Sequence, residues 1–212
     1  IGSNGTASWI ACPAGSGAGL RFDGSDNRIV PTEGDGTNRN AAVDLGYSSS
    51  RFKDLYLSGG VYLGGTGSAN KLDDYEEGTF TPFIRINNGV QGITVSHANG
   101  AYTKVGRVVH VTARWRITDK GTNVGGVTLD GLPFNVANVL NTTGYEASAS
   151  LGHISGMIGT WYSMLANANE GTTELGFSIR VSATASDYTN LTNTHIADTF
   201  DGRISCTYIT DA

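Results

Sequence analysis

Apolar and polar residues alternate over several stretches of this chain, a pattern that predicts half-buried antiparallel β-strands. The clearest stretch runs from Arg107 to Thr118, and its apolar positions share one face: Val109, Val111, Ala113, Trp115 and Ile117. Two shorter stretches alternate in the same way and point these residues inward: Leu175, Phe177, Ile179 and Val181 in one, Ile204, Cys206 and Tyr208 in the other. Patterns with the 3.6-residue period of an amphipathic helix are missing.

Turn-like residues divide the same part of the chain into further short strands. We expect these strands around 79–86, 92–96, 100–105, 125–129, 149–158 and 194–199. The turns between strands are expected at Asn- and Asp-Gly-rich sites: 87–89, 99–100, 119–121 and 201–202. Eight or more short strands predict an all-β fold, with a β-sandwich or jelly-roll head over 78–212.

Residues 1–63 follow a different pattern, with only very short apolar stretches between Gly, Ser, Asp and Asn clusters. These stretches lie at 20–22, 29–30, 43–45, 55–57 and 61–63. Strands this short cannot bury a core within one chain. Because β-branched and aromatic residues persist here, which a pure linker would not need, we expect a thin, intertwined homo-oligomeric β-stalk.

A junction separates this stalk from the head. Residues 64–68 are Gly-rich, and residues 69–77 (ANKLDDYEE) are the one stretch in which we expect a helical turn, capped by Ser68 or Asn70 and ended by Gly78. On such a turn Leu72 and Tyr75 are three residues apart and can both face a three-fold axis. The predicted division is therefore a stalk over 1–63, a neck over 64–77 and a head over 78–212.

Composition and charge narrow the classes of partner. The chain has 212 residues, a formal net charge of −5, 16% charged residues and 30 Gly, and its 9 Tyr, 7 Phe and 3 Trp are enough to build a core. An acidic balance without a basic run argues against a nucleic-acid partner. No apolar run reaches the roughly 18 residues that would span a bilayer, so we expect no membrane insertion.

Several consecutive motifs resemble the distal part of tailed-bacteriophage tail fibres. Residues 44–65 (DLGYSSSRFKDLYLSGGVYLGG) resemble the terminal stalk repeat of these fibres, and residues 71–82 (KLDDYEEGTFTP) resemble the neck motif before their C-terminal head. Residues 100–111 (GAYTKVGRVVHV) and 131–134 (GLPF) resemble recurrent strands of that head. The resemblance covers roughly residues 40–134 and fades after about residue 135.

The resemblance implies a homotrimeric fibre tip on a virion, assembled in the host cytoplasm. Its expected partners are a host-surface glycan or surface protein and the other tail proteins of the virion. The expected function is non-catalytic adhesion through the trimeric head. Two alternatives remain open, a polysaccharide depolymerase head on the same stalk and a purely structural domain that trimerises and caps the fibre.

The residues themselves favour the non-catalytic interpretation. Carboxylates of the head have no spacing that suggests a paired acid and base: Glu146, Glu170, Glu174, Asp187, Asp198 and Asp201. The His residues at 97, 110, 153 and 195 have no metal-ligand spacing, so no cofactor is predicted, although one His per chain could meet a metal on a trimer axis. Residues 23–27 (DGSDN) and 35–38 (DGTN) are better interpreted as Asx turns than as calcium loops.

A glycan site pairs an aromatic platform with Asn, Asp or backbone groups, because a sugar ring has an apolar face and a rim of hydroxyls. Three regions interpreted as loops offer this mixture, at 135–149, 159–172 and 185–194. The candidate ligand-binding residues are Tyr145, Trp161, Tyr162, Asp187, Tyr188 and Asn190. Alternatively, Trp161 and Tyr162 extend a strand from Met157 and fill the core or the trimer interface. We expect the site at the end of the head that lies away from the neck.

Overall fold

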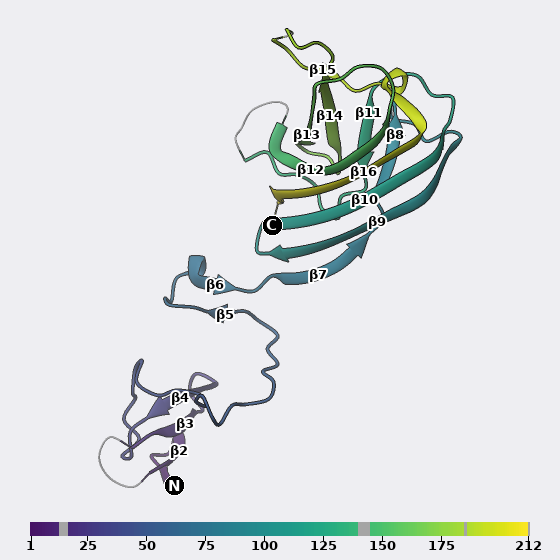
Figure 1. Ribbon diagram of the computed structural model, residues 1–212. Helices are drawn as coiled ribbons and strands as arrows, with labels where there is room; N and C mark the ends of the chain where they lie inside the picture. The colour runs from purple at the N-terminus through teal and green to yellow at the C-terminus, as the bar shows by residue number, and fades with distance from the viewer. Residues whose placement is uncertain (13–16, 140–144, 185, 212) are drawn as a thin grey trace. The chain divides into compact units, whose positions relative to one another are not determined.

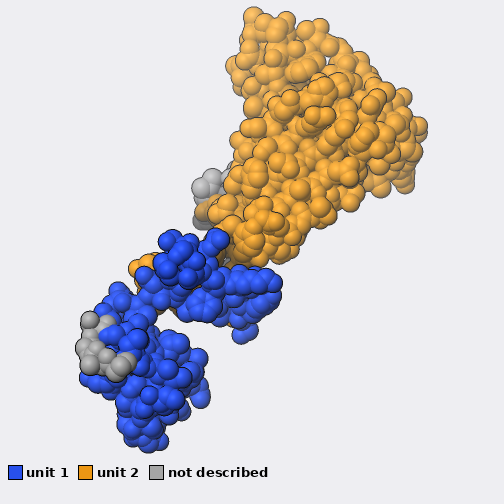
Figure 2. Space-filling view, turned by 60° about the horizontal axis from the view of Figure 1, so that its bottom comes forward, with its two compact units in different colours: residues 1–58 blue, residues 59–212 orange. Residues whose placement is uncertain are grey.

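The computed structural model describes residues 1–12, 17–139, 145–184 and 186–211, and it confirms an all-β protein with 54% strand and 3% helix. The chain forms two compact units, residues 1–58 and residues 59–212, which Figure 2 draws in blue and orange. The first unit ends five residues before the predicted end of the stalk. The predicted neck and head both belong to the second unit.

The first unit is built on a four-stranded antiparallel sheet of short strands in sequence order. The strands are β1 (Gly2–Ser3), β2 (Ala7–Ala11), β3 (Gly19–Asp23) and β4 (Arg28–Thr32). On one face the loop after β4 covers Trp9. Gly36 has a φ of +88° there, and a Cβ on it would lie 2.7 Å from Trp9 Cε2, so this position needs glycine for two reasons.

The other face of this sheet is apolar and largely uncovered within one chain, although residues 43–46 and Phe52 line a hollow with Ile10, Leu20 and Phe22. Phe22 and Ile29 are direct cross-strand neighbours, and they are 45% and 62% exposed. Ile10 and Leu20 form the adjacent pair and are exposed as well. Ala7 is the only buried apolar side chain among the described residues of this unit. The predicted lack of a self-sufficient core is therefore confirmed, although the apolar stretches at 43–45 and 55–57 form no strand.

The neck differs from the predicted helical turn. Only Ser68–Asn70 forms a single 3₁₀ turn, η1, followed by β6 (Lys71–Leu72), which pairs with β5 (Val61–Tyr62). The expected helix over 69–77 is wrong beyond residue 70, because Tyr75 already begins β7 and pairs with β9. An isolated helical turn makes too few hydrogen bonds to compete with a strand ladder. Leu72 and Tyr75 therefore lie on different strands rather than on one helical face.

The second unit holds one antiparallel sheet of ten strands that curls around a single core (Figure 1). Its path is β7-β9-β10-β16-β12-β13-β14-β11-β8, and β15 pairs with β14 beside this path. The strands are β7 (Tyr75–Phe80), β8 (Phe83–Ile86), β9 (Ile93–Val105), β10 (Val108–Lys120), β11 (Val127–Asp130), β12 (Tyr145–Met157), β13 (Ser163–Asn169), β14 (Leu175–Arg180), β15 (Thr189–Asn190) and β16 (Ile196–Ile209). A short 3₁₀ turn, η2 (Asn193–His195), precedes β16.

The core follows the predicted alternation closely. The five inward residues predicted for the strand at 107–118 are all buried on β10: Val109, Val111, Ala113, Trp115 and Ile117. Trp115 is fully buried, with its ring centroid 5.6 Å from that of Phe177 and 5.7 Å from that of Phe200. Leu175, Ile179, Ile204, Cys206 and Tyr208 are buried too, whereas Val181 lies beyond β14 and is exposed.

Two predicted turns are instead continuous strand. Asn99 and Gly100 lie inside β9, and Asp201 and Gly202 lie inside β16. A Cβ on Gly100 would lie 2.4 Å from Phe80 Cε1, and one on Gly202 would lie 2.1 Å from Trp115 Cζ2. Both glycines therefore admit an aromatic ring rather than reverse the chain. The turn predicted at 87–89 is confirmed, with positive φ at Asn87 and Asn88.

Candidate ligand-binding site

One end of the ten-stranded sheet lies beside the neck, and the other end lies away from it. The backbone N–H of Gly106, in the β9–β10 turn, donates to the carbonyl of Asp74, so this end of the sheet lies beside the neck. From there β10 runs to Lys120 at the far end, where β12 finishes, β13 begins and β14 finishes. Figure 1 places β15 at this far end and β6 and β7 at the neck end.

Tyr162 and Tyr188 both lie at the far end. The backbone N–H of Tyr162 donates to the carbonyl of Arg180 at 2.8 Å, and Ser163, the next residue, pairs with Arg180. The Ser163 hydroxyl shares a hydrogen bond of 3.0 Å with the Tyr188 hydroxyl. Two residues far apart in the sequence are thus held within one hydrogen-bond network by the pairing of β13 with β14.

The aromatic side chains of this cluster are accessible on the single chain. Tyr162 is 54% exposed, Tyr188 39% and Trp161 38%. Trp161 and Tyr162 precede β13 rather than extend β12, which ends at Met157. Trp161 and Tyr162 therefore do not fill the core of this chain. Two interpretations of these side chains remain, an aromatic platform for a ligand and an interface with another chain.

The guanidinium of Arg180 fixes the loop that leads towards Tyr188. It donates to the carbonyls of Ser182 and Ala183 at 3.3 Å and 3.1 Å. Further along, Asp187 is exposed and Asn190 sits on β15, where it pairs with Ser178. Neither the Asp187 nor the Asn190 side chain bonds to another residue that the structure describes, so both are available to a ligand.

A small hollow of about 120 Å³ lies where β11 and β15 meet along the edge of β14. Its lining includes Asn190, Gly126, Thr128, Asn169 and Gly176. The Thr128 hydroxyl and the Asn169 amide oxygen are buried there without a hydrogen-bond partner among the described residues. Because Asn169 is six residues, or about 20 Å along β13, from Ser163, this hollow extends from Asn190 towards the neck end of the sheet and away from Tyr162 and Tyr188.

Tyr145 is not brought into this cluster. Its backbone pairs with Asn169 on β13, six residues from Ser163, which corresponds to about 20 Å along a strand. Tyr145 therefore begins β12 at the neck end, and its side chain lies outside the described part of the structure. Residues 140–144 and 185, which belong to two of the predicted loops, also lie outside it. Residues 163–169 form β13 rather than part of a loop.

A second polar hollow of about 450 Å³ contains two carboxylates from different strands. Arg85 Nη1 donates to Asp130 Oδ2 at 2.6 Å and to Glu174 Oε1 at 3.2 Å. The Thr173 hydroxyl donates to the other Asp130 oxygen at 2.6 Å. A guanidinium group therefore occupies the space between the two carboxylates. In a glycoside hydrolase, the glycosidic oxygen would have to lie in that space.

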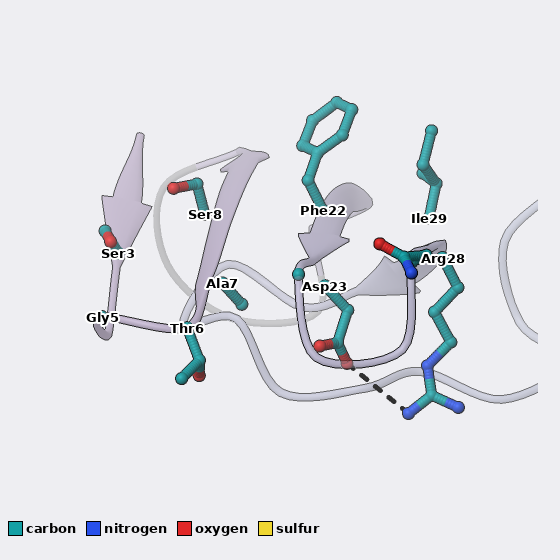
Figure 3. A pocket seen from close by; sticks show the side chains of 11 residues that line it. Ser3, Gly5, Thr6, Ala7, Ser8, Phe22, Asp23, Arg28 and Ile29 are labelled. Carbon is teal, nitrogen blue, oxygen red and sulfur yellow. Dashed lines mark hydrogen bonds and ion pairs between the residues drawn. The ribbon is translucent and has the colours of Figure 1, made fainter.

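A hollow of about 480 Å³ in the first unit surrounds the Asp23 turn (Figure 3). The Asp23 carboxylate accepts hydrogen bonds from the Ser25 hydroxyl at 2.6 Å and from Arg21 at 2.6 Å, and these bonds hold its pKa well below its usual range. It also accepts from the backbone N–H of Ser25, as Asp35 does from that of Thr37. The Asx turns predicted at 23–27 and 35–38 are confirmed, and the Asp23 carboxylate is engaged by its own chain.

Within the described ranges, no three His, Cys, Asp or Glu side chains gather as a metal site would require. Nor does any helix there have the length and apolarity needed to cross a membrane. Comparison with family models, with curated proteins and with solved structures finds no match to this chain.

Proposed function

We propose that this chain is the distal part of a tailed-phage tail fibre that binds a host-surface glycan without cleaving it. The observation that carries the proposal is the far-end cluster, in which Tyr162 and Tyr188 are exposed and the side chains of Asp187 and Asn190 have no partner among the described residues. Aromatic faces stack on the apolar face of a sugar, and the exposed Asp187 carboxylate and Asn190 amide suit its hydroxyls. The stalk-like and neck-like motifs point to the same kind of virion protein.

The uncovered face of the first unit supports a homotrimer with an intertwined stalk. Phe22 and Ile29 expose an apolar pair on a sheet that buries almost nothing within one chain. Monomeric soluble proteins seldom leave such a surface open. Two further copies of the chain would cover this face. The curled sheet of the second unit would form one jelly-roll head in each of the three chains.

Trimerisation matters for adhesion because it multiplies weak contacts. Three heads on one fibre, and several fibres on one virion, convert reversible single contacts into strong attachment. A host-surface protein is a second possible receptor for the same cluster, and other tail proteins of the virion are the expected partners of the stalk.

The arrangement around Arg85 favours binding over hydrolysis. It separates Asp130 and Glu174, the two head carboxylates that the fold brings together in a hollow. A depolymerase head remains the alternative, and release of new reducing ends from host polysaccharide would establish it. A purely structural cap would bind neither host cells nor glycans.

Replacing Tyr188 with Ala should weaken binding to host cells while leaving the fold intact. The lost platform is worth about 1 kcal/mol, or roughly fivefold per site, and three sites amplify it. Tyr188→Phe is the matched control, because it keeps the ring and removes only the hydrogen bond to Ser163. Cell binding by the folded variants, with melting temperature measured in parallel, tests the site. If the Tyr188→Ala and Trp161→Ala variants stay folded and fully adhesive, the far-end cluster is not the receptor site.

A further inference from the structure

Three arginines lie together on the outer face of the ten-stranded sheet. Arg114 and Arg116 alternate along β10 with buried Ala113, Trp115 and Ile117, so their side chains point away from the core. Arg203 lies directly opposite Arg114 on β16. On the other side, Arg114 faces Asn99 of β9, so that Asn99, Arg114 and Arg203 form one row across three strands. We call Asn99, Arg114, Arg116 and Arg203 the arginine patch.

The patch concentrates positive charge in a chain whose net charge is −5. Among the described residues, the carboxylate that forms an ion pair with the patch is that of Asp201, opposite Arg116. Its Oδ2 lies 3.4 Å from Arg114 Nη2, and its Oδ1 is buried without a partner within the described ranges. The guanidinium groups of Arg116 and Arg203 form no ion pair or hydrogen bond with any residue that the structure describes. Three guanidinium charges therefore face a single carboxylate.

The pairing of Arg114 with Arg203 is unfavourable without a counter-charge. Side chains directly opposite in an antiparallel pair are about 5 Å apart at Cβ, and like charges at that position destabilise the sheet. Arg114 also has its Nε buried with no acceptor among the described residues. The Asp201 carboxylate beside Arg114 has an equally unpartnered Oδ1, which can serve this N–H. The guanidinium groups left without a partner in the described part of the chain are therefore those of Arg116 and Arg203, and a negative group from outside the chain would offset the repulsion between Arg203 and Arg114.

The surface between these residues can hold such a group. A hollow of about 440 Å³ is lined by Asn99, Thr112, Arg114 and Arg203, with small residues such as Ala101 leaving room above the strands. Guanidinium groups bind carboxylate, sulfate and phosphate through paired N–H donors. The Asn99 amide and the Thr112 hydroxyl beside them suit the hydroxyls of a sugar ring.

We infer that the arginine patch binds the anionic group of an acidic glycan, a sugar unit that carries a carboxylate or an ester sulfate or phosphate. The choice of a glycan as the source of the anion rests on the proposed function, whereas the anion site itself rests on the patch. The far-end cluster then stacks on neutral sugar faces, and the patch selects acidic polymers.

The test uses the whole protein and five probes: a uronate polysaccharide, a sialate polysaccharide, a sulfated dextran, neutral dextran and double-stranded DNA. Equilibrium binding should be measured for the native chain, Arg203→Gln and Arg51→Gln, the last being an exposed arginine of the first unit with the same charge change. We expect Arg203→Gln to weaken binding of at least one acidic polysaccharide about tenfold, with a smaller dependence on salt. Arg51→Gln and neutral dextran should show no such effect.

Melting temperature and NMR provide a second test that needs no polysaccharide. Without anions, Arg203→Gln should melt at the same temperature as the native chain or higher, because it removes the repulsion with Arg114. In an NMR titration, free glucuronate or sulfate should shift the Nε–Hε signal of Arg114 in the native chain, and less in Arg203→Gln. A lower melting temperature for Arg203→Gln in the absence of anions would mean that Arg203 has a structural role and would overturn the inference.

The outcomes separate the two proposals. If the small anions shift the Arg114 signal and no polysaccharide is retained, the patch is an anion site and the glycan-adhesion proposal fails. If polysaccharides bind equally well to the native chain and to Arg203→Gln, the adhesion proposal stands and the patch proposal fails. Binding of DNA in preference to every acidic polysaccharide would also overturn the assignment to a glycan.

Discussion

Replacing Trp115 with Ala is expected to destabilise the second unit by about 3–5 kcal/mol, because it removes the largest fully buried side chain of the core. The ring packs against Phe177 and Phe200 and occupies the space left by Gly202, so its loss leaves a cavity between two strands. For a unit of this size, such a loss corresponds to a melting temperature lower by roughly 6–20 °C.

Trp115→Phe provides the control. It keeps an aromatic ring in the cluster and removes the indole N–H, which is buried without a partner among the described residues. It should therefore melt much closer to the native chain than Trp115→Ala does. The melting temperatures of the native chain and the two variants, measured by calorimetry, test this expectation. Equal melting temperatures for the native chain and Trp115→Ala would contradict the described core.

Replacing Phe22 and Ile29 together by Asp is expected to abolish assembly. The two side chains are direct neighbours on the uncovered face of the first unit, so the double variant places two carboxylates where partner copies would pack. Burying unpaired carboxylates costs far more than the apolar contacts they replace. The mass measured by light scattering should fall from about 67 kDa, three times 22.2 kDa, to that of one chain.

Val124→Asp is the matched control for this variant, since Val124 is an exposed apolar residue of the second unit that is 71% accessible. It should leave the trimer mass unchanged. A native chain that is a folded monomer, or a Phe22→Asp, Ile29→Asp variant that keeps the trimer mass, would show that this face is not the assembly surface.

Strand identity could be predicted from the sequence wherever side chains alternate strongly. Val109, Val111 and Trp115 repeat with a period of two over a long stretch, and the structure buries all three. The strand at 163–169 escaped detection because its inward residues include Ala166 and Ala168, which are small and carry little pattern among the Asn residues. Local signals were thus reliable only where the buried residues are large.

Glycine misled the prediction of strand ends for a physical reason. Asn-Gly and Asp-Gly are typical of tight turns, but Gly100 and Gly202 are needed because Phe80 and Trp115 approach the backbone from a neighbouring strand. The helical turn predicted for the neck failed similarly, since the partner strand for Tyr75 is 30 residues away at Val105. Such contacts depend on the register of distant strands, which a single sequence does not display.

The candidate site, too, could be predicted only where local signals suffice and not where strand register decides. Tyr162, Tyr188 and Asn190 could be predicted because aromatic and Asn residues gather in the part of the chain after about residue 135. The fold places these three residues at the far end of the sheet. Tyr145 could not be separated from them, because its distance depends on the register between β12 and β13. Thr128 gave no signal, since its hollow arises only where β11 and β15 meet beside β14.

The central claim is that the folded chain binds a host-surface glycan, and one measurement tests it most directly. The purified protein is applied to an array of bacterial envelope polysaccharides, and retention is measured with and without the same polysaccharide in solution. We predict that at least one polysaccharide retains the protein and that the free polymer releases it. A folded protein that is retained by no polysaccharide across the panel would contradict the account.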